Sequence, residues 1–319
     1  MWESTDGVSF TAMTVKPVSY YGPTNVLFSV ACHGGTVVAV GADSGGVHGN
    51  PRTSTWISTG GGPLNEITSG LGLYGGEDAI GIGGISGGDG GFLIVGDRVD
   101  ASGGPGAAVW TSPDGVVFTL RDAVPALESD ARGVVEAQAA TPIGKGFVAV
   151  GGIRPPDSQL AARDPLAWTS PDGQTWQRQS FPHTAGDDLL LSVAEVGSGS
   201  LAISTDASGF EARAADANGT GWHRTARFGS LQTDATTVVQ VPSLVAIGSK
   251  AYAVVSNPSQ FQMWRGGTDG SWTQVALPET VSATPLSSGP RVVRAASAGT
   301  ELMVAADDGT SAHIWFTAP

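Results

Sequence analysis

The chain has 319 residues, a formal net charge of −13, 40% apolar residues, 47 glycines and 19 prolines. The acidic balance argues against nucleic-acid binding, which needs clustered Lys and Arg, and no run of 18 apolar residues suggests a membrane span. So many glycines and prolines favour short strands and tight turns over long helices.

One pattern recurs along the chain: an apolar run, a Gly-rich turn, a second apolar run, and a strand with a tryptophan. The clearest copies of the last strand are Val109–Phe118 and Ala167–Trp176, where Asp-Gly follows the tryptophan. Successive tryptophan strands lie about 46 to 58 residues apart, which is the size of a β-propeller blade. A four-stranded unit cannot bury both of its faces alone, so we predict an all-β propeller formed as a single domain over residues 1–319.

Each repeat is predicted to hold four strands, A to D. Strands A are expected at Asn25–Ala31, Ala79–Ile85, Gly133–Ala139, Leu189–Glu195, Thr237–Pro242 and Arg291–Ala296. Strands B are expected at Thr36–Gly41, Gly91–Gly96, Gly146–Gly151, Ser200–Ser204, Lys250–Val255 and Thr300–Ala305. Strands C contain Trp56, Trp110, Trp168, Trp264 and Trp315, with a degenerate fourth copy at Ala212–Ala215. Strands D carry an apolar or aromatic residue such as Phe118, Trp176, Trp222 and Trp272.

The composition of these strands predicts how they pack. Apolar runs in strands A and B are nearly continuous, which predicts that neighbouring blades cover both faces. The tryptophans are expected to fill the gaps between blades. Glycines in one strand A, such as Gly83, suit a crowded axis where the inner strands meet. The single cysteine, Cys32, lies in an apolar run, and we expect it in the core.

The two chain ends predict how the ring closes. The last repeat has strands A, B and C, and Val8–Met13 has the pattern of an unpaired strand D. Pairing these two would give six blades and remove an exposed sheet edge. However, Trp2–Gly7 is itself a copy of the strand C motif, so Trp2 and Trp315 compete for one position. A seventh blade is therefore the alternative.

Two hairpins, Ser112–Phe118 and Ser170–Trp176, resemble the Asp-box repeats of sialidase-type (BNR-repeat) propellers. Thr5–Phe10 and Thr268–Trp272 are weaker copies. In such a hairpin Asp caps the turn, Gly supplies a positive φ, and the aromatic residue anchors the turn between blades. This sequence lacks the residue that usually separates Asp from Gly in an Asp-box. The resemblance implies the propeller fold and a location outside the cytoplasm, whereas the motif itself is a folding element.

The resemblance does not extend to the sialidase catalytic residues. That family implies three arginines, a Tyr–Glu pair, an acidic Asp and an Arg-Ile-Pro signature, whereas this chain has Ile153-Arg154-Pro155 in a different order. We therefore expect a non-enzymatic, secreted or cell-surface propeller that binds a protein or glycan. The alternatives are a glycoside hydrolase or lyase, with two carboxylates at the mouth of the central channel, and a purely structural spacer.

The connections between strands predict which face binds. The A–B and C–D turns are short, whereas the D–A and B–C segments, on the opposite face, are long and concentrate in the N-terminal half. Their ranges are Thr14–Thr24, Ala42–Ser54, Thr68–Asp78, Asp97–Ala107, Arg121–Arg132, Ile153–Leu166 and Gln179–Asp188. The predicted ligand-binding residues on this face are Tyr20, Tyr21, His48, Arg52, Tyr74, Asp97, Arg98, Arg154, Asp157 and His183.

No cofactor or catalytic metal is predicted, since the five histidines lack metal-ligand spacing. Adjacent carboxylates at Asp187–Asp188 and Asp307–Asp308 are the residues that calcium would use, although solvated turns also explain them. We expect a monomer that does not insert into a membrane or bind nucleic acid. The start of the chain has no basic and apolar leader, so a targeting segment is expected to be absent from this chain.

Overall fold

The computed structural model describes the chain except for residues 44–50, 71, 122, 157–161, 180, 184–185, 207, 232–239, 257–259, 278–291, 299, 308–310 and 318–319. The starts of two predicted strands A, at 237–239 and 291, therefore lie outside the described residues. The described residues form strands, one 3₁₀ turn (η1, Gly22–Thr24) and no α-helix. By their internal contacts they divide into two compact units, Met1–Pro156 with Trp168–Arg178 and Asp157–Ala167 with Gln179–Pro319.

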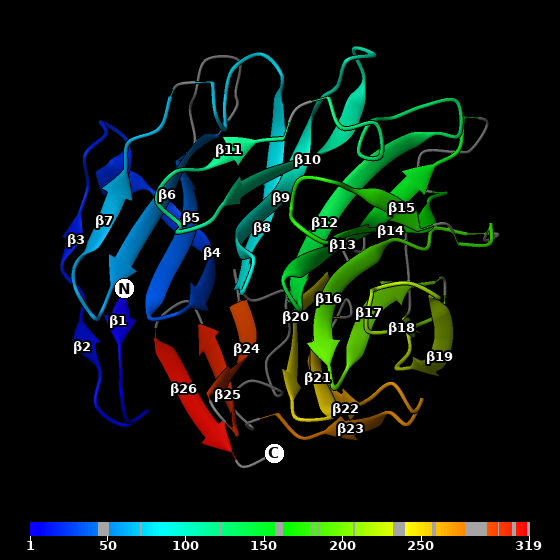
Figure 1. The fold of residues 1–319 in the computed structure, drawn as a ribbon. Coiled ribbons are helices and arrows are strands. Elements are labelled where there is room, and N and C mark those ends of the chain that lie inside the picture. The colour runs from blue at the N-terminus through cyan, green and yellow to red at the C-terminus, as the bar shows by residue number, and fades with distance from the viewer. Residues whose placement is uncertain are drawn as a thin grey trace. The chain divides into compact units, whose positions relative to one another are not determined.

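Six sheets follow one another along the chain, as the repeat predicts (Figure 1). The first sheet contains β4 (Val26–His33), β5 (Thr36–Asp43), β6 (Arg52–Thr59) and β7 (Leu64–Ile67). A short strand, β3 (Val15–Lys16), adds to it in parallel with β7. The second sheet contains β8 (Ala79–Gly88), β9 (Gly91–Val99), β10 (Pro105–Ser112) and β11 (Thr119–Leu120). The third contains β12 (Val134–Ile143), β13 (Gly146–Arg154), β14 (Asp164–Ser170) and β15 (Gln177–Gln179).

The later sheets repeat the same antiparallel order. The fourth contains β16 (Leu190–Val196), β17 (Gly199–Thr205), β18 (Phe210–Ala215) and β19 (His223–Phe228). The fifth contains β20 (Gln240–Ile247), β21 (Lys250–Ser256), β22 (Phe261–Gly266) and β23 (Thr273–Val275). The sixth has three strands, β24 (Val292–Ala298), β25 (Glu301–Asp307) and β26 (Ala312–Thr317). The prediction of a six-bladed, all-β propeller fold is confirmed.

The predicted closing strand is wrong. Within Val8–Met13, β2 (Thr11–Ala12) pairs with β1 (Trp2–Glu3) in a separate two-stranded sheet, with Trp2 opposite Ala12. In the described chain β26 pairs with β25 alone. The copy of the strand C motif at Trp2 explains the difference, because it supplies a local partner for the strand that follows it. A short hairpin closes a much smaller loop than a pairing across the whole chain.

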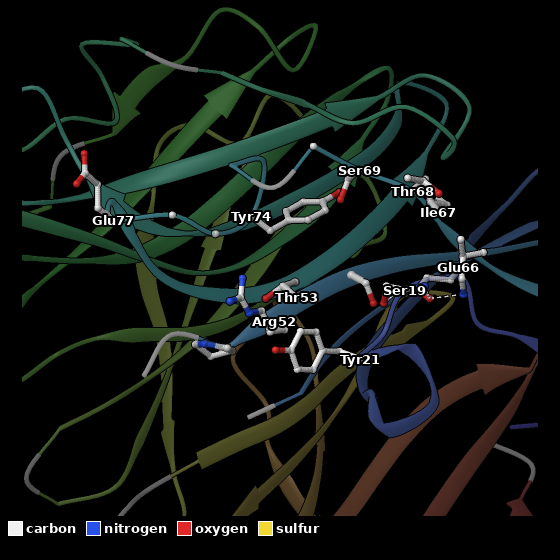
Figure 2. A pocket seen from close by; sticks show the side chains of 16 residues that line it. Ser19, Tyr21, Arg52, Thr53, Glu66, Ile67, Thr68, Ser69, Tyr74 and Glu77 are labelled. Carbon is white, nitrogen blue, oxygen red and sulfur yellow. Dashed lines mark hydrogen bonds between the residues drawn. The ribbon is translucent and has the colours of Figure 1, made fainter. Parts of the chain in front are cut away.

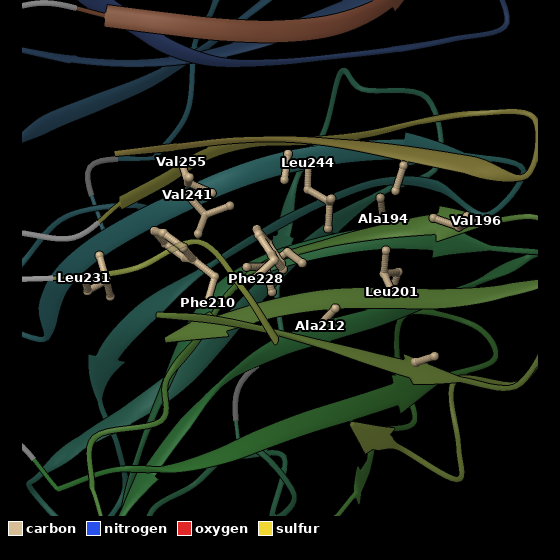
Figure 3. Close-up of a cluster of buried hydrophobic side chains, with 14 residues drawn as sticks. Ala194, Val196, Leu201, Phe210, Ala212, Phe228, Leu231, Val241, Leu244 and Val255 are labelled. Atoms are coloured by element: carbon tan, nitrogen blue, oxygen red, sulfur yellow. The ribbon is translucent and has the colours of Figure 1, made fainter. Parts of the chain in front are cut away.

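Within each unit, apolar side chains fill the spaces between neighbouring sheets, as predicted. Trp110 packs with Val38 and Val40 of the first sheet and with Phe92 and Ile94 of its own sheet. In the second unit, Phe210 and Phe228 of the fourth sheet pack with Val255 of the fifth (Figure 3). The Phe228 ring stacks on Trp272, with centroids 4.3 Å apart. Neighbouring blades of a unit therefore bury their faces against one another.

Two predictions about burial are corrected. Strands B of the first five sheets are largely buried on both faces. The first inner strand β4 is not, because Val26, Phe28 and Val30 alternate outward and are 69, 41 and 54% exposed. Inner strands have a neighbouring sheet on only part of their surface, so the period-2 alternation of a half-exposed strand applies. Cys32 lies on this same exposed side and is not a core residue.

Inner strands of neighbouring blades are joined by hydrogen bonds at β-bulges. The pairing of β4 with β5 shifts register at Leu27/Ser29, and the Ser29 hydroxyl accepts a hydrogen bond from the Ile85 amide of β8 at 3.1 Å. The pairing of β20 with β21 shifts at Gln240/Ser243, and the Ser243 hydroxyl accepts one from the Ala295 amide of β24 at 2.9 Å. A bulge removes a residue from the ladder. In both pairs the serine directly after the bulge bonds the backbone of the next blade.

The Asp-Gly hairpins form as their chemistry predicts. The Asp172 carboxylate accepts hydrogen bonds from the Gln174 and Thr175 amides at 2.8 and 2.7 Å. These amide bonds, which outweigh the effect of burial, hold the pKa of Asp172 below its usual range. Gly115 in the preceding copy has a φ of 80°, in the left-handed region that favours glycine.

Candidate functional site

A cavity of about 570 Å³ opens in the first unit, a volume within the usual range of small-ligand pockets. We call it the tyrosine cavity. Its walls come from the segment before β4, the start of β6, the end of β7 and the loop that leads to β8 (Figure 2). The lining residues are Val18, Ser19, Tyr21, Pro51, Arg52, Thr53, Ser54, Glu66, Ile67, Thr68, Ser69, Gly70, Tyr74, Gly75, Gly76 and Glu77.

Glu66 fixes one wall of the tyrosine cavity. Its carboxylate accepts hydrogen bonds from the Val18 and Ser19 amides at 2.6 and 2.8 Å and from the Ser19 hydroxyl at 2.6 Å. Burial acts to raise the pKa of Glu66, but the hydrogen bonds from Ser19 and Val18 outweigh it and hold this pKa below its usual range. Glu66 is therefore an ionised anchor that ties the segment before β4 to β7.

Tyr21 and Arg52 form the adjacent wall. The Arg52 guanidinium lies over the Tyr21 ring in a cation–π contact, with its central carbon 5.4 Å from the ring centroid. Tyr20 packs edge-to-face on Tyr21 with centroids 5.1 Å apart. Nε of Arg52 is buried, and no atom of the described residues accepts a hydrogen bond from it. Protein atoms cover Nε, so a ligand in the cavity would meet the other nitrogens of the guanidinium.

Tyr74 reaches the tyrosine cavity from the loop before β8. It is buried, and its ring packs on Trp110 and Phe118 at centroid distances of 5.9 and 6.5 Å. Its hydroxyl donates to Thr55 Oγ1 at 3.5 Å. Burial raises the pKa of this phenol, so it stays protonated. Tyr74 is thus a rigid, neutral part of the wall.

Hydrogen bonds to the second sheet hold the loop that carries Tyr74. Arg98 donates to the carbonyls of Gly72 and Gly75 at 3.4 and 3.5 Å and pairs with Asp78 at 3.4 Å. The Trp110 indole donates to the Leu73 carbonyl at 2.7 Å. These bonds hold the loop that carries Tyr74 in one position, as a preformed binding site requires.

The structure brings three of the predicted binding residues together in the tyrosine cavity: Tyr21, Arg52 and Tyr74. Tyr20 packs on Tyr21 of the cavity wall and is 90% exposed. Arg98 does not line the cavity but donates hydrogen bonds to the loop that carries Tyr74. His48 and Asp157 lie outside the described residues.

The other predicted residues lie elsewhere. Asp97 and Arg98 are part of β9, where they pair with Ala107 and Gly106, so the expected long loop Asp97–Ala107 is wrong. Arg154 likewise ends β13, opposite Val134. Strand pairing continues past the apolar runs because backbone hydrogen bonds do not require apolar side chains. His183, in the second unit, lies 2.9 Å from Asp164 on the surface.

Asp97 carries a strongly perturbed carboxyl group. Its Oδ1 accepts a hydrogen bond from the Ala137 amide at 2.9 Å. Burial, together with the neighbouring Glu136 carboxylate, raises the pKa of Asp97 to about 7. Perturbed carboxyls often mark functional sites, but Asp97 does not line the tyrosine cavity. Its bond to β12 indicates a role in joining blades.

A buried ionic cluster occupies the fourth sheet in the second unit. The Nη2 atom of Arg213 bonds both Asp188 and Glu211, and the bond to Glu211 is 2.7 Å long. Arg224 and Arg227 bond the other Glu211 oxygen at 2.9 and 2.7 Å. These arginines satisfy the Glu211 carboxylate, so the cluster is a structural tie.

The structure shows the contacts of two of the predicted calcium ligands. Asp187 pairs with Arg163 at 2.5 Å, and Asp188 belongs to the ionic cluster. Asp308 lies outside the described residues. In the described ranges, no group of three or more His, Cys, Asp or Glu residues is gathered as a metal site would require. Calcium binding stays a prediction.

Sequence reasoning did not identify Glu66, Ser19 or Ser69 as cavity residues. Glu66 is a lone acidic residue in the short strand β7. A single charged residue between apolar neighbours predicts a side chain that points to solvent, and not one that lines a cavity. Only the fold of the segment before β4 brings the Val18 and Ser19 amides to it. No pattern within either segment signals that meeting.

No known family model matches the chain, and no curated protein is significantly similar in sequence. The solved structures that resemble it share its fold. Pyrococcus horikoshii acylaminoacyl peptidase aligns over 93% of this chain and 45% of its own, at 11% identity and a TM-score of 0.53. Trypanosoma rangeli sialidase aligns over 97% and 56%, at 10% identity and 0.51. A Mycobacterium tuberculosis puromycin-hydrolysing peptidase aligns over 97% and 47%, at 14% identity and 0.50.

This chain thus spans about half the length of these three structures. At such identities the likeness establishes the fold alone. Within the part of the chain that is described, no helix is long and apolar enough to cross a membrane.

Proposed function

We propose that the protein is a non-enzymatic propeller that binds a protein or glycan ligand in the tyrosine cavity. The observation that carries this proposal is Arg52, which lines the cavity, holds its guanidinium over the Tyr21 ring and has no ion-pair partner among the described residues. Rigid aromatic rings beside an unpaired polar group are the usual make-up of a ligand pocket. The loops of the predicted long-loop face supply most of the walls.

The chemistry of the cavity supports binding over hydrolysis. A glycoside hydrolase needs one carboxyl group with a raised pKa beside a second, ionised one. The two carboxylates that line the cavity are Glu66 and Glu77, and Figure 2 shows them toward opposite ends of it. Glu66 already accepts three hydrogen bonds and has a lowered pKa, so it is a poor general acid.

The resemblance of the Asp-Gly hairpins to sialidase-type repeats supports a location outside the cytoplasm. We propose that the protein acts there as a monomer.

The test blocks the cavity without disturbing the core. Gly70 lines the cavity, and a Cβ at this position meets no atom within 4 Å, so Gly70→Trp adds bulk in open space. Gly72, in the same loop, also has open space but does not line the cavity. Wild type would be screened against a glycan array and a peptide array, and the affinity of each hit would be measured for both variants.

We expect Gly70→Trp to abolish binding of the hits and Gly72→Trp to retain it, with equal thermal midpoints for both variants. Retained binding by Gly70→Trp would place the ligand elsewhere on the molecule. The alternative function, glycoside hydrolysis, rests on the two carboxylates in one cavity. It predicts release of reducing ends from a glycan hit, and loss of that release in Glu77→Gln.

A further inference from the structure

We propose that the ligand of the tyrosine cavity presents a carboxylate to Arg52, and that this carboxylate is the C-terminus of a peptide. The inference rests on the proposed function, and it assigns the chemical class of the ligand. Its starting point is an arginine that lines the cavity and for which the described chain provides no carboxylate partner.

Arg52 is prepared for an anion. Its guanidinium lies over the Tyr21 ring, and no carboxylate of the described residues pairs with it. The lining carboxylate of Glu66 is occupied by the amides of Val18 and Ser19 and by the Ser19 hydroxyl. Arginine binds a carboxylate through two parallel N–H donors, and such charge-assisted pairs are among the stronger hydrogen bonds.

The charge of the cavity favours a carboxylate over a phosphate. Its described lining holds one cation, Arg52, and two carboxylates, Glu66 and Glu77. A phosphate carries close to two negative charges at neutral pH and three strong acceptors, so it would meet net repulsion here. A carboxylate carries a single charge, so it meets less repulsion from Glu66 and Glu77 while it pairs with Arg52.

The remaining lining favours a peptide over an acidic sugar. Val18, Pro51, Ile67 and the two tyrosines provide apolar and aromatic surface for the last side chain of a peptide. The described lining contains no Asn, Gln, His or Asp, so few side chains are available to bond the hydroxyls of a sugar.

The experiment uses a library of N-acetylated hexapeptides of random sequence with free C-terminal carboxylates, and the same library with C-terminal amides. Peptides retained by the wild-type protein would be identified by mass spectrometry, and the dissociation constant of the best peptide measured in both forms. Oligogalacturonate serves as the acidic-glycan probe. Arg52→Gln removes the positive charge, whereas Arg52→Lys keeps the charge but lacks the two parallel N–H donors of arginine. Arg265→Gln is the control, at an exposed arginine of the second unit.

We expect the acid form to bind about tenfold to a hundredfold more tightly than the amide. Arg52→Gln should erase this difference, Arg52→Lys should restore part of it, and Arg265→Gln should leave it unchanged. Equal binding of acid and amide, no retained peptide, or retention of oligogalacturonate alone would each overturn the proposal. In each case the Gly70→Trp and Gly72→Trp pair, with the array hits, tests the cavity as a binding site independently.

Discussion

Asp97 joins two blades through a bond whose strength depends on pH. Its carboxyl group bonds the bulged strand of the next blade through Ala137, yet its pKa is raised to about 7 by burial and by Glu136. An unfolded Asp titrates near 3.8. As pH rises from about 4 to about 7, the unfolded chain releases a proton that the folded protein retains. The free energy of unfolding therefore falls through this window.

We predict that Asp97→Asn stabilises the protein above neutral pH. The amide cannot ionise, and its oxygen still accepts the Ala137 hydrogen bond. Relative to wild type, the free energy of unfolding should rise by roughly 1–3 kcal/mol near pH 8 and change little near pH 4. Urea unfolding at both pH values measures this difference. Asp89→Asn, at a carboxylate whose side chain is 71% exposed, is the control and should show no such pH-dependent gain.

Ser243 allows a second test at a single side chain. Its hydroxyl accepts a hydrogen bond from the buried Ala295 amide of the next blade at 2.9 Å. In Ser243→Ala this amide loses its partner, and an unsatisfied buried donor costs about 1–3 kcal/mol. Chemical denaturation should show a loss of that size, while Ser297→Ala, at an exposed serine of the same strand β24 as Ala295, should stay near wild type. Equal losses in both variants would refute the role given to this bond.

Among the strands, β8 and β12 approach closely because β8 carries glycines. A Cβ at Gly83 would lie 2.7 Å from the Gln138 carbonyl oxygen of β12, whereas a Cβ at Gly81 would meet nothing within 4 Å. Neither glycine has a positive φ, so the two substitutions differ in space and not in backbone strain.

We predict that Gly83→Ala destabilises the protein by about 1–3 kcal/mol, because the neighbouring backbone must shift. Gly81→Ala should remain within about 0.5 kcal/mol of wild type or gain slightly, because alanine restricts the unfolded chain. Thermal and denaturant unfolding of the two variants provide the comparison. A Gly83→Ala variant as stable as Gly81→Ala would mean that the two strands can separate at no cost.

For the protein as a whole, the formal charge of −13 opposes the approach of an anionic ligand. Arg52 attracts a carboxylate only at short range, whereas repulsion from all the charges of the protein acts over about 10 Å at 0.1 M salt. We therefore predict that the association rate constant of a C-terminal peptide with net negative charge increases between about 20 and 300 mM salt. Stopped-flow fluorescence measures this rate. A peptide with the same terminus and a net positive charge should show the opposite slope, and equal slopes would contradict the prediction.

Much of the fold follows from local sequence. The apolar runs and Gly-rich turns predicted the inner strand pairs of all six sheets, because each pair is joined by a turn of a few residues and needs no distant partner. The Asp-Gly turns were predictable for the same reason, since Asp172 bonds residues only two and three positions ahead. Strand ends were less predictable. At Asp97 and Arg154 the ladder continues into polar residues that resemble loop sequence.

The amino-acid sequence alone was enough to predict the repeat, the six-bladed all-β class, and the three cavity residues that come from long connecting segments, Tyr21, Arg52 and Tyr74. The three-dimensional structure was needed to show that these three share a cavity and that the segment before β4 binds Glu66. It was also needed to show that β2 pairs with β1 and not with the last blade.

The physical reason for this division is distance along the chain. Strands and turns are set by residues a few positions apart, and these residues can be compared directly in the sequence. A cavity wall is formed by side chains tens of residues apart, which meet only when the folded segments pack together.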